Sequence, residues 1–220
     1  MTRIKICGIT RVQDVQLVVK HGADALGMVF YAHSPRNVSV PQAAKLVAAT
    51  PPFITTVGLF VNPLADEVRD VLRHVPLSVL QFHGEEDAEF CAQFGLPYLK
   101  AIRVKPEIDL LQCASLYQGS KTHQGAQGLL LDAFVEGTHG GTGRSFDWNL
   151  IPRNLPLPVI LSGGLNVDNV AQAIQQVRPY AVDISSGVEL SPKELNRGIK
   201  DGAKVAAFIN EVKRIDLQLS

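Results

Sequence analysis

Four residues spread along the chain have side chains that could move a proton or bind an anion. Cys7 ends a short β-branched run, and Asp132 ends the apolar run Gly128–Asp132. A thiol or a carboxyl group at the end of a buried strand can act as a general base or a general acid. His83 and Arg36 lie in segments that follow two other apolar runs, where ligand-binding residues are common. The question is whether these side chains meet at one site.

Each of these residues also has a purely structural interpretation. A cysteine on a strand is usually a small buried hydrophobe, and we expect that role for Cys91 and Cys113. Asp132 could cap the next turn, and His83 could be a structural histidine whose hydrogen bonds are satisfied. Arg36 could be a solvated loop charge.

Two glycine-rich segments in the second half of the chain could hold a phosphate group. They are Ser162–Leu165 (SGGL) and Ser185–Glu189 (SSGVE), and each follows an apolar run. Small residues let backbone N–H groups approach an anion closely, and a helix start at Ser191-Pro192 would add partial positive charge. A third glycine-rich segment, Gly140–Gly143, could lie alongside. The alternative is that these glycines only make tight turns.

Short apolar runs alternate with segments of helical period along the whole chain. Such alternation favours parallel βαβ units with right-handed crossovers. Eight units in 220 residues fit a single-domain (β/α)8 barrel over residues 1–220 better than an open sheet, which would normally carry a GxGxxG motif. The predicted strands are Arg3–Cys7, Ala25–Phe30, Thr55–Val61, Ser78–Phe82, Tyr98–Val104, Gly128–Asp132, Val159–Ser162 and Ala181–Ser185.

Helix start signals occur between these strands. Thr10 opens a predicted capping box, and Asn62 before Pro63 is a predicted N-cap. Asn166 precedes an apolar stripe at helical spacing, and Ser191–Glu194 combines a cap, a proline and a capping glutamate. The last helix is predicted to bury one stripe, formed by Ile199, Ala203, Ala206 and Ile209.

Strand parity predicts which side chains face the barrel interior. If Cys7 points inward, so does Lys5, whereas Ile4 and Ile6 face the helices. A buried ammonium group needs a counter-charge, and Asp183 on the last predicted strand is the expected partner of Lys5. Functional groups of such barrels lie at the C-terminal ends of the strands, and phosphate often binds after strands seven and eight. The two glycine-rich segments occupy that position.

Composition narrows the functional classes. Hydrophobic residues make up 46% of the chain, which is enough for a large core, and acidic and basic residues balance at 21 each. We therefore expect neither nucleic acid nor a membrane as a partner. The three cysteines form no CxxC pair, so we expect no disulfide framework, no metal and a cytoplasmic location. No apolar run reaches the length of a membrane span, and we expect no signal peptide.

Seven motifs occur in one order along the chain. KICGIT, SPR, QFHG and LLLDA are followed by GGTGRSFDW, LSGGLN and DISSGVE. Together they resemble the phosphoribosylanthranilate isomerase family of tryptophan biosynthesis, and the resemblance covers essentially the whole chain. It implies a single-domain (β/α)8 barrel. The one departure is Phe82, where leucine is more usual, and this change replaces one apolar residue with another.

The resemblance also implies roles for individual residues. It implies Cys7 as the general base, Asp132 as the general acid and Arg36 as a substrate-binding residue, whose fork geometry suits the anthranilate carboxylate. The resemblance also implies that the phosphate binds at the pairs Gly163-Gly164 and Ser186-Gly187. The full predicted substrate-binding set is Arg36, His83, Gly163, Gly164, Asp183, Ser186 and Gly187.

The implied reaction is an Amadori rearrangement of a phosphorylated N-glycosylamine into an aminoketose phosphate. An acid must protonate the furanose ring oxygen, and a base must then remove the proton from C2. A partly desolvated mouth would keep Asp132 protonated, and a positive local field would ionise Cys7. This chemistry requires no cofactor. We expect a small phosphorylated substrate, and a monomer rather than a homodimer.

Three alternatives remain open from the sequence. The histidine-pathway isomerase runs the same reaction type but places an aspartate on the first strand, so Cys7 argues against it. A Schiff-base aldolase would use Lys5 as its nucleophile. A non-enzymatic phosphate-binding barrel would keep the glycine-rich loops without turnover, and the presence of both Cys7 and Asp132 argues against it.

Overall fold

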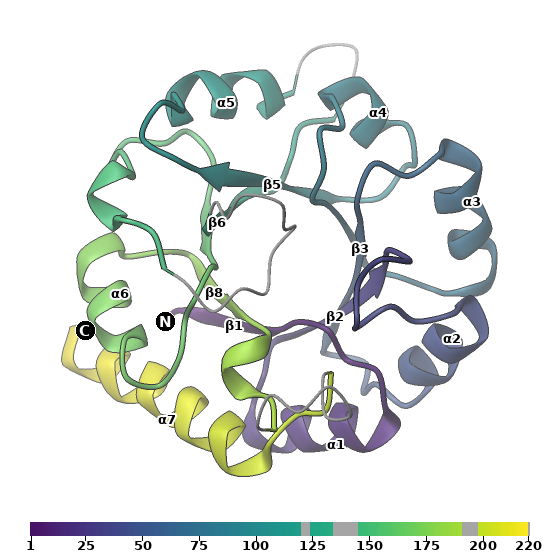
Figure 1. The fold of residues 1–220 in the computed structure, drawn as a ribbon, viewed down its shortest axis with the longest axis horizontal. Helices are drawn as coiled ribbons and strands as arrows, with labels where there is room; N and C mark the ends of the chain where they lie inside the picture. The colour runs from purple at the N-terminus through teal and green to yellow at the C-terminus, as the bar shows by residue number, and fades with distance from the viewer. Residues whose placement is uncertain (120–123, 134–144, 191–197, 220) are drawn as a thin grey trace.

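Eight parallel strands close into one barrel in sequence order, and α-helices surround it (Figure 1). The computed structural model describes residues 1–119, 124–133, 145–190 and 198–219. The predicted barrel is therefore confirmed, the open sheet is excluded, and every predicted strand matches within one residue at each end. The strands are β1 (Arg3–Ile6), β2 (Ala25–Phe30), β3 (Thr55–Phe60), β4 (Val79–Phe82), β5 (Tyr98–Val104), β6 (Gly128–Ala133), β7 (Val159–Leu161) and β8 (Ala181–Ile184).

The helices form an outer ring that covers the apolar side of the strands. They are α1 (Val12–His21), α2 (Val40–Ala48), α3 (Ala65–His74), α4 (Ala88–Ala92), α5 (Leu110–Tyr117), α6 (Val170–Val177) and α7 (Gly202–Leu219). Two 3₁₀ turns, η1 (Trp148–Leu150) and η2 (Ser186–Val188), follow β6 and β8. The predicted features at Gly140–Gly143 and Ser191–Glu194 lie outside the described residues.

The barrel is closed by contacts between the two ends of the chain. β1 pairs with β8, and this register sets Lys5 beside Asp183. The backbone N–H of Thr2 donates to Oδ2 of Asp216 at 2.6 Å, and the Thr2 hydroxyl donates to Oδ1 at 2.8 Å. Figure 1 shows α7, which carries Asp216, between α1 and α6 on the outside of the barrel.

The main core lies between the strands and the helices. Ile4 and Ile6 of β1 are buried there with Val15 and Val18 of α1, as strand parity predicts. Phe82 belongs to the same layer and is fully buried. Its ring centroid lies 5.8–6.1 Å from those of four other rings, and such aromatic contacts stabilise beyond area burial alone. The partners are Phe60, Phe90, Phe94 and Tyr98. The departure from leucine thus supplies the centre of an aromatic cluster.

Two predicted helix starts are wrong because the side chains bind elsewhere. α1 begins at Val12 without a side-chain cap, and the Thr10 hydroxyl donates to the carbonyl oxygen of Gly198 at 3.1 Å. Asn62 has a left-handed φ of 45°, and α3 begins only at Ala65. The Asn62 side chain instead accepts a hydrogen bond from the backbone N–H of Glu85 at 2.7 Å, which ties two loops together.

The predicted apolar stripes of the last two helices are only partly correct. Asn166 caps a turn that precedes α6, and Val167 lies outside the helix and is exposed. In α7, Ile209 is buried as predicted, but Ala203 is exposed and Ile199 precedes the helix. The predicted stripe therefore started before the first residue of the helix, Gly202. The buried stripe consists of Val205, Phe208, Ile209, Val212 and Ile215.

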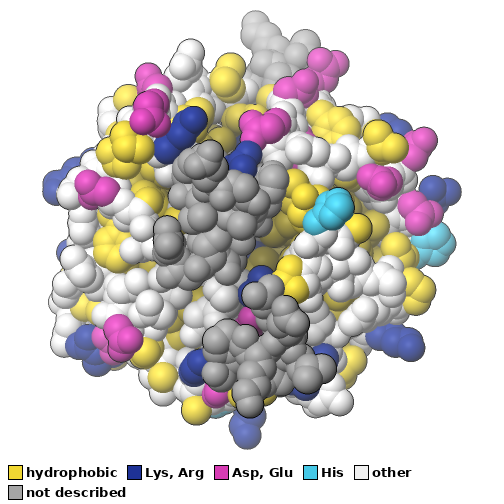
Figure 2. Space-filling model, viewed as in Figure 1, with side chains coloured by type: hydrophobic (Ala, Val, Ile, Leu, Met, Phe, Trp, Pro, Cys, Tyr) yellow, Lys and Arg dark blue, Asp and Glu magenta, His cyan; other side chains and the backbone are white. Residues whose placement is uncertain are grey.

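The surface carries charges of both signs. Figure 2 shows acidic and basic side chains interspersed on the visible face, without a large region of one sign. None of the helices in the described part of the chain is long and apolar enough to cross a membrane.

Candidate functional site

Cys7 lies at the C-terminal end of β1 and points into the barrel. It follows the last strand residue, its backbone N–H donates to the carbonyl oxygen of Ile184 at 2.8 Å, and its side chain is 5% exposed. Its inner neighbours are Val29, Leu59 and Val61 from β2 and the end of β3. The other two cysteines lie elsewhere. Cys91 is buried as predicted, whereas Cys113 is only half-buried, because it lies on the edge of α5.

Lys5 and Asp183 form a buried ion pair, as the sequence predicts. Nζ of Lys5 lies 2.8 Å from Oδ1 of Asp183, and the two side chains are 5% and 6% exposed. The Ser162 hydroxyl donates to the other carboxylate oxygen at 3.3 Å. Burial lowers the pKa of Lys5, but the charges of Asp183 and Cys7 more than offset it, so the pKa lies above its ordinary value. Lys5 therefore stays an ammonium group and is a poor amine nucleophile.

The surroundings of Cys7 act on its thiol in opposite directions. Burial raises the pKa of the Cys7 thiol, the charges of Lys5 and Lys200 lower it, and the Asp183 carboxylate raises it. The net result is a pKa above the ordinary value of a thiol. Without the two ammonium groups the thiolate would be rarer still.

Arg36 reaches the mouth through the space above Gly8. A Cβ on Gly8, whose φ is 74°, would lie 2.4 Å from Cδ of Arg36, so only glycine admits this path. Nε and Nη2 of Arg36 donate to the two carboxylate oxygens of Glu189 at 2.6 and 2.9 Å. Nζ of Lys200 lies 3.0 Å from Oε1 of the same carboxylate. Arg36 is therefore not a solvated loop charge.

The charges around Glu189 shift two pKa values. Burial alone would raise the pKa of Glu189, but the hydrogen bonds and charges of Arg36 and Lys200 bring it below its ordinary value. Burial and the charge of Arg36 lower the pKa of Lys200, although Glu189 opposes them. We call Lys5, Cys7, Arg36, Glu189 and Lys200 the thiol side of the mouth.

Asp132 is buried at the end of β6 and contacts His83. Nε2 of His83 lies 3.1 Å from Oδ2 of Asp132, and Nδ1 lies 3.1 Å from Nε2 of Gln81. The other carboxylate oxygen accepts the backbone N–H of Ala133 at 2.9 Å. His83 is thus satisfied as a structural histidine would be, and it also touches the predicted acid. We call Gln81, His83 and Asp132 the carboxyl side of the mouth.

The first predicted phosphate loop contains two consecutive glycines in the left-handed region. Gly163 and Gly164 have φ values of 80° and 68°, and side-chain amides of Asn166 and Asn169 donate to the carbonyl oxygen of Gly164. A Cβ on Gly187 would lie 2.3 Å from the carbonyl oxygen of Leu165, so the two loops are in close contact. In the described part of the chain, no hydrogen-bond acceptor faces the backbone N–H groups of Gly163, Gly164, Ser186 and Gly187.

Gly163 also joins the phosphate loops to the acid. A Cβ at this position would lie 2.4 Å from the backbone nitrogen of Ala133 and 2.9 Å from Oδ1 of Asp132. The loop after β7 therefore packs directly against the end of β6. Any larger residue here would displace the carboxyl group.

Several residues that organise the mouth were missed by the sequence analysis. Nζ of Lys100 donates to the carbonyl oxygen of Gly84 at 2.6 Å and to Oε2 of Glu86 at 2.9 Å, and it is fully buried. This pair fixes the turn that carries His83. A lysine in the middle of an otherwise apolar strand segment was a signal in the sequence that could have pointed to Lys100. The sequence gives no comparable signal for Lys200, because this residue lies 16 positions beyond the end of β8.

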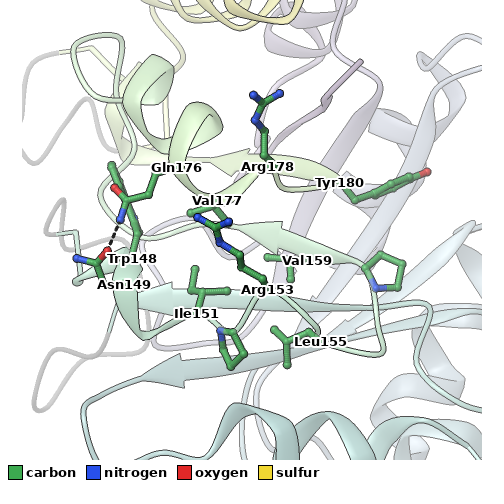
Figure 3. Close-up of a pocket in the computed structure, with 12 residues that line it drawn as sticks. Trp148, Asn149, Ile151, Arg153, Leu155, Val159, Gln176, Val177, Arg178 and Tyr180 are labelled. Atoms are coloured by element: carbon green, nitrogen blue, oxygen red, sulfur yellow. Dashed lines mark hydrogen bonds between the residues drawn. The ribbon is translucent and has the colours of Figure 1, made fainter. Parts of the chain in front are cut away.

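A cavity of about 380 Å³ lies away from this mouth, between η1, the segment before β7 and the end of α6. Figure 3 shows Arg153 and Arg178 beside it, with a hydrogen bond between Gln176 and Asn149 at its edge. Pro158 and Tyr180 line it at the N-terminal ends of β7 and β8. Chemistry in such barrels occurs at the C-terminal ends, so we place the site at the mouth. Among the described residues, no group of three or more potential ligand side chains is arranged to hold a metal.

Comparison with known proteins identifies the family. The family model described as N-(5'phosphoribosyl)anthranilate (PRA) isomerase matches residues 4–211. The chain belongs to this family. It is therefore an isomerase of tryptophan biosynthesis that converts N-(5'-phosphoribosyl)anthranilate to 1-(2-carboxyphenylamino)-1-deoxyribulose 5-phosphate. This membership excludes the three alternatives that the sequence left open.

Individual relatives match nearly the whole chain. N-(5'-phosphoribosyl)anthranilate isomerase of Nitrosospira multiformis is 55% identical over 210 residues, which cover 96% of each chain. The crystal structure of phosphoribosyl anthranilate isomerase from Thermotoga maritima has a TM-score of 0.85 and 38% identity, over 97% of this chain and all of that one. A similar structure, with a TM-score of 0.82, 38% identity and the same coverage, contains reduced 1-(o-carboxyphenylamino)-1-deoxyribulose 5-phosphate.

Proposed function

We propose that the isomerisation proceeds by general acid–base catalysis, with Asp132 as the acid and Cys7 as the base. Asp132 donates its proton to the furanose ring oxygen, and the ring opens to a Schiff base. Cys7 then removes the proton from C2, and the enolamine that forms tautomerises to the ketone. The observation that carries this proposal is that both groups are buried at C-terminal strand ends of one mouth, in chemically different surroundings.

The carboxyl side can keep a proton available for ring opening. Nε2 of His83 faces Oδ2 of Asp132 at 3.1 Å, so one proton can lie between the two atoms. If Nε2 accepts, the proton resides on Asp132 and is ready for transfer. Gln81 supports this tautomer when its amide oxygen accepts from Nδ1–H, since the oxygen and nitrogen of an amide can exchange places.

The phosphate group is proposed to bind at the paired loops after β7 and β8. The undonated N–H groups of Gly163, Gly164, Ser186 and Gly187 support this, since backbone N–H groups suit phosphate oxygens. The solved relative that contains a reduced aminoketose phosphate supports the same class of ligand. We further propose that His83 and Asp183 border the substrate, because both lie at strand ends beside a catalytic group.

Arg36 is proposed to bind the anthranilate carboxylate. Glu189 occupies Nε and one edge of Nη2, so further N–H donors of the guanidinium group remain for a second carboxylate. Lys200 balances part of the negative charge that a second carboxylate would bring near Glu189. Glu189 thus holds Arg36 in place rather than competing for it.

The decisive experiment follows the C2 proton in the variant Cys7→Ser. A serine hydroxyl keeps the size of the thiol but is far too weak an acid to supply a base near neutral pH. We expect turnover to fall by about 10²–10⁴-fold, with exchange of the C2 proton into deuterated solvent lost in product incubated with the variant. Wild-type exchange with slow turnover would instead assign the C2 proton to another group, and Asp183 would be the next candidate.

We also propose that residues 1–220 form one catalytic domain, active as a monomer in the cytoplasm. One chain supplies the thiol side, the carboxyl side and the phosphate loops, so a partner subunit is not needed to complete the site. All three cysteines are free thiols, as a reducing compartment favours. Light scattering at the concentration of the activity assay tests the oligomeric state.

A further inference from the structure

Gly27 of β2 is the neighbour of both inward side chains of β1. A Cβ built on Gly27 would lie 2.7 Å from Sγ of Cys7 and 3.2 Å from Cε of Lys5. The first distance is shorter than a real carbon–sulfur contact, so the thiol occupies the space that any other residue would fill. Gly27 is buried and has an ordinary negative φ, so the backbone conformation does not require glycine here. The requirement comes from Cys7, through its thiol and its Cα atom, and from the stem of Lys5.

Lys5 is held between two anionic or potentially anionic groups. The carboxylate of Asp183 fixes Nζ from β8, and the thiol of Cys7 lies on the same face of β1, two residues further along. Because Gly27 has no side chain, the stem of Lys5 and the thiol of Cys7 both border the space that a Cβ atom at this position would fill. An ammonium group at that place favours the thiolate.

We propose that Lys5 is a positioning residue that stabilises the thiolate of Cys7, and that Gly27 is the residue that allows the two side chains to meet. The proposal deepens the assignment of Cys7 as the base and rests on it for its catalytic meaning. Lys5 itself transfers no proton to the substrate and forms no covalent bond with it. The same lysine that the sequence offered as an aldolase nucleophile thus serves an isomerase electrostatically.

The charged groups that face the thiol define the expected effect of each change. Lys5 and Lys200 favour the thiolate, and Asp183 disfavours it. Replacing Lys5 alone would leave Asp183 as an unpaired buried carboxylate, which both destabilises the fold and repels the thiolate. The double variant Lys5→Met with Asp183→Asn removes the pair together and leaves a neutral interior.

The experiment is a pH titration of thiolate absorbance in the ultraviolet, recorded without substrate. Each protein is measured against the same protein with Cys7→Ser, so that Cys91 and Cys113 cancel. We expect the Cys7 midpoint of the double variant to rise by about one pH unit, which is a tenfold loss of thiolate at a given pH. The limb of the pH profile of kcat/KM that reports the ionisation of Cys7 should move by the same amount.

A second variant keeps the test decisive if the double variant does not fold. Gly27→Ala keeps every charge but forces the thiol away from its place, so it should also raise the midpoint. Gly58→Ala on β3 is the matched control, because its Cβ would meet Leu77 and Phe60 in the outer core rather than the barrel interior. It should lower the melting temperature without moving the thiol midpoint.

The outcomes separate this proposal from the assignment of the base. A thiol midpoint that is unchanged in the folded double variant, or in Gly27→Ala, overturns the role of Lys5 or of Gly27. A midpoint that rises while the kcat/KM profile stays fixed supports the role of Lys5 and overturns Cys7 as the base. The titration contains no substrate, so the first result does not depend on the mechanism.

Discussion

The thiol side and the carboxyl side of the mouth each hold one proposed proton-transfer group, but the residues that surround the two groups differ in charge. The thiol side combines Cys7 with three cations and the carboxylate of Glu189, and Asp183 of β8 pairs with one of the cations, Lys5. The carboxyl side has one carboxyl group, one imidazole and one amide in a row. A base that must lose a proton in a buried place needs nearby positive charge. An acid that must keep its proton is favoured by burial and by a hydrogen-bond partner that accepts that proton.

Substitutions on the two sides should impair the enzyme by different routes. On the thiol side, charge is balanced over several residues, so a single neutralisation alters binding, pH response and stability together. On the carboxyl side, Asp132 acts with few partners, so its replacement should affect turnover with little effect on binding.

Asp132→Asn should be the most damaging single change on the carboxyl side. The amide keeps the shape and hydrogen bonds of the carboxyl group but has no acidic proton, so kcat should fall by about 10²–10⁴-fold. KM should change by no more than a few fold, because the phosphate loops and Arg36 are untouched. Steady-state kinetics with freshly prepared substrate measures both. Asp109→Asn, which alters only the cap of α5, is the control and should match wild type. Loss of affinity rather than turnover would contradict the comparison.

Arg36→Met should act on binding instead. A charge-assisted hydrogen bond contributes about 1.5–3 kcal/mol, so the affinity for the aminoketose phosphate product should fall by roughly ten- to a hundredfold. The apolar stem of methionine can still pass above Gly8. Isothermal titration with the product gives the affinity, and titration with inorganic phosphate provides the contrast. Equal losses for both ligands would mean that Arg36 does not read the anthranilate carboxylate.

Glu189→Gln should lower stability by an amount that depends on pH. The folded-state pKa of Glu189 lies below its ordinary value of 4.5, so its charge stabilises the fold above that pH and the contribution is lost as pH falls through the folded value. The variant should therefore be less stable by about 1.5–3 kcal/mol near neutral pH, and the difference should narrow below pH 4.5.

Urea unfolding at several pH values measures this difference. Glu211→Gln is the matched control, because Glu211 pairs with Arg214 on the outer surface of α7 and should contribute little. A gap between wild type and Glu189→Gln that stays constant with pH would show that the glutamate is not held as an anion by Arg36 and Lys200.

Phe82→Leu should have the smallest effect and only on stability. Phe82 lies between Gln81 and His83 in sequence but faces the helices, so its truncation opens space among four other rings. We expect a loss of about 1–2 kcal/mol in unfolding free energy and an unchanged kcat. A marked fall in kcat would show that the carboxyl side depends on the packing behind it.

The barrel and its inward-facing residues could be predicted from the sequence, because both follow from local rules. Alternation of period gave the strands, and parity together with the cost of a buried charge gave the Lys5–Asp183 pair. Prediction from the sequence failed where a side chain could bind a distant partner. Thr10 and Asn62 were predicted as helix caps, but their side chains form hydrogen bonds to other loops. Glu189 and Lys200 could not be paired with Arg36 from sequence alone, because Arg36 and Glu189 are 153 positions apart. The void that Gly27 leaves could be recognised only with neighbouring strands in place.

The bond that closes the barrel has a consequence for how the protein is made. Lys5 and Asp183 are separated by 178 positions in the sequence, and Thr2 and Asp216 by 214. Long-range contacts form slowly, because the intervening chain must be ordered first. A nascent chain that ends before β8 exposes β1 as an unpaired edge and leaves an ammonium group without its counter-ion. The thiol side is therefore among the last parts of the molecule to be assembled, and premature termination removes activity even when most strands have been synthesised.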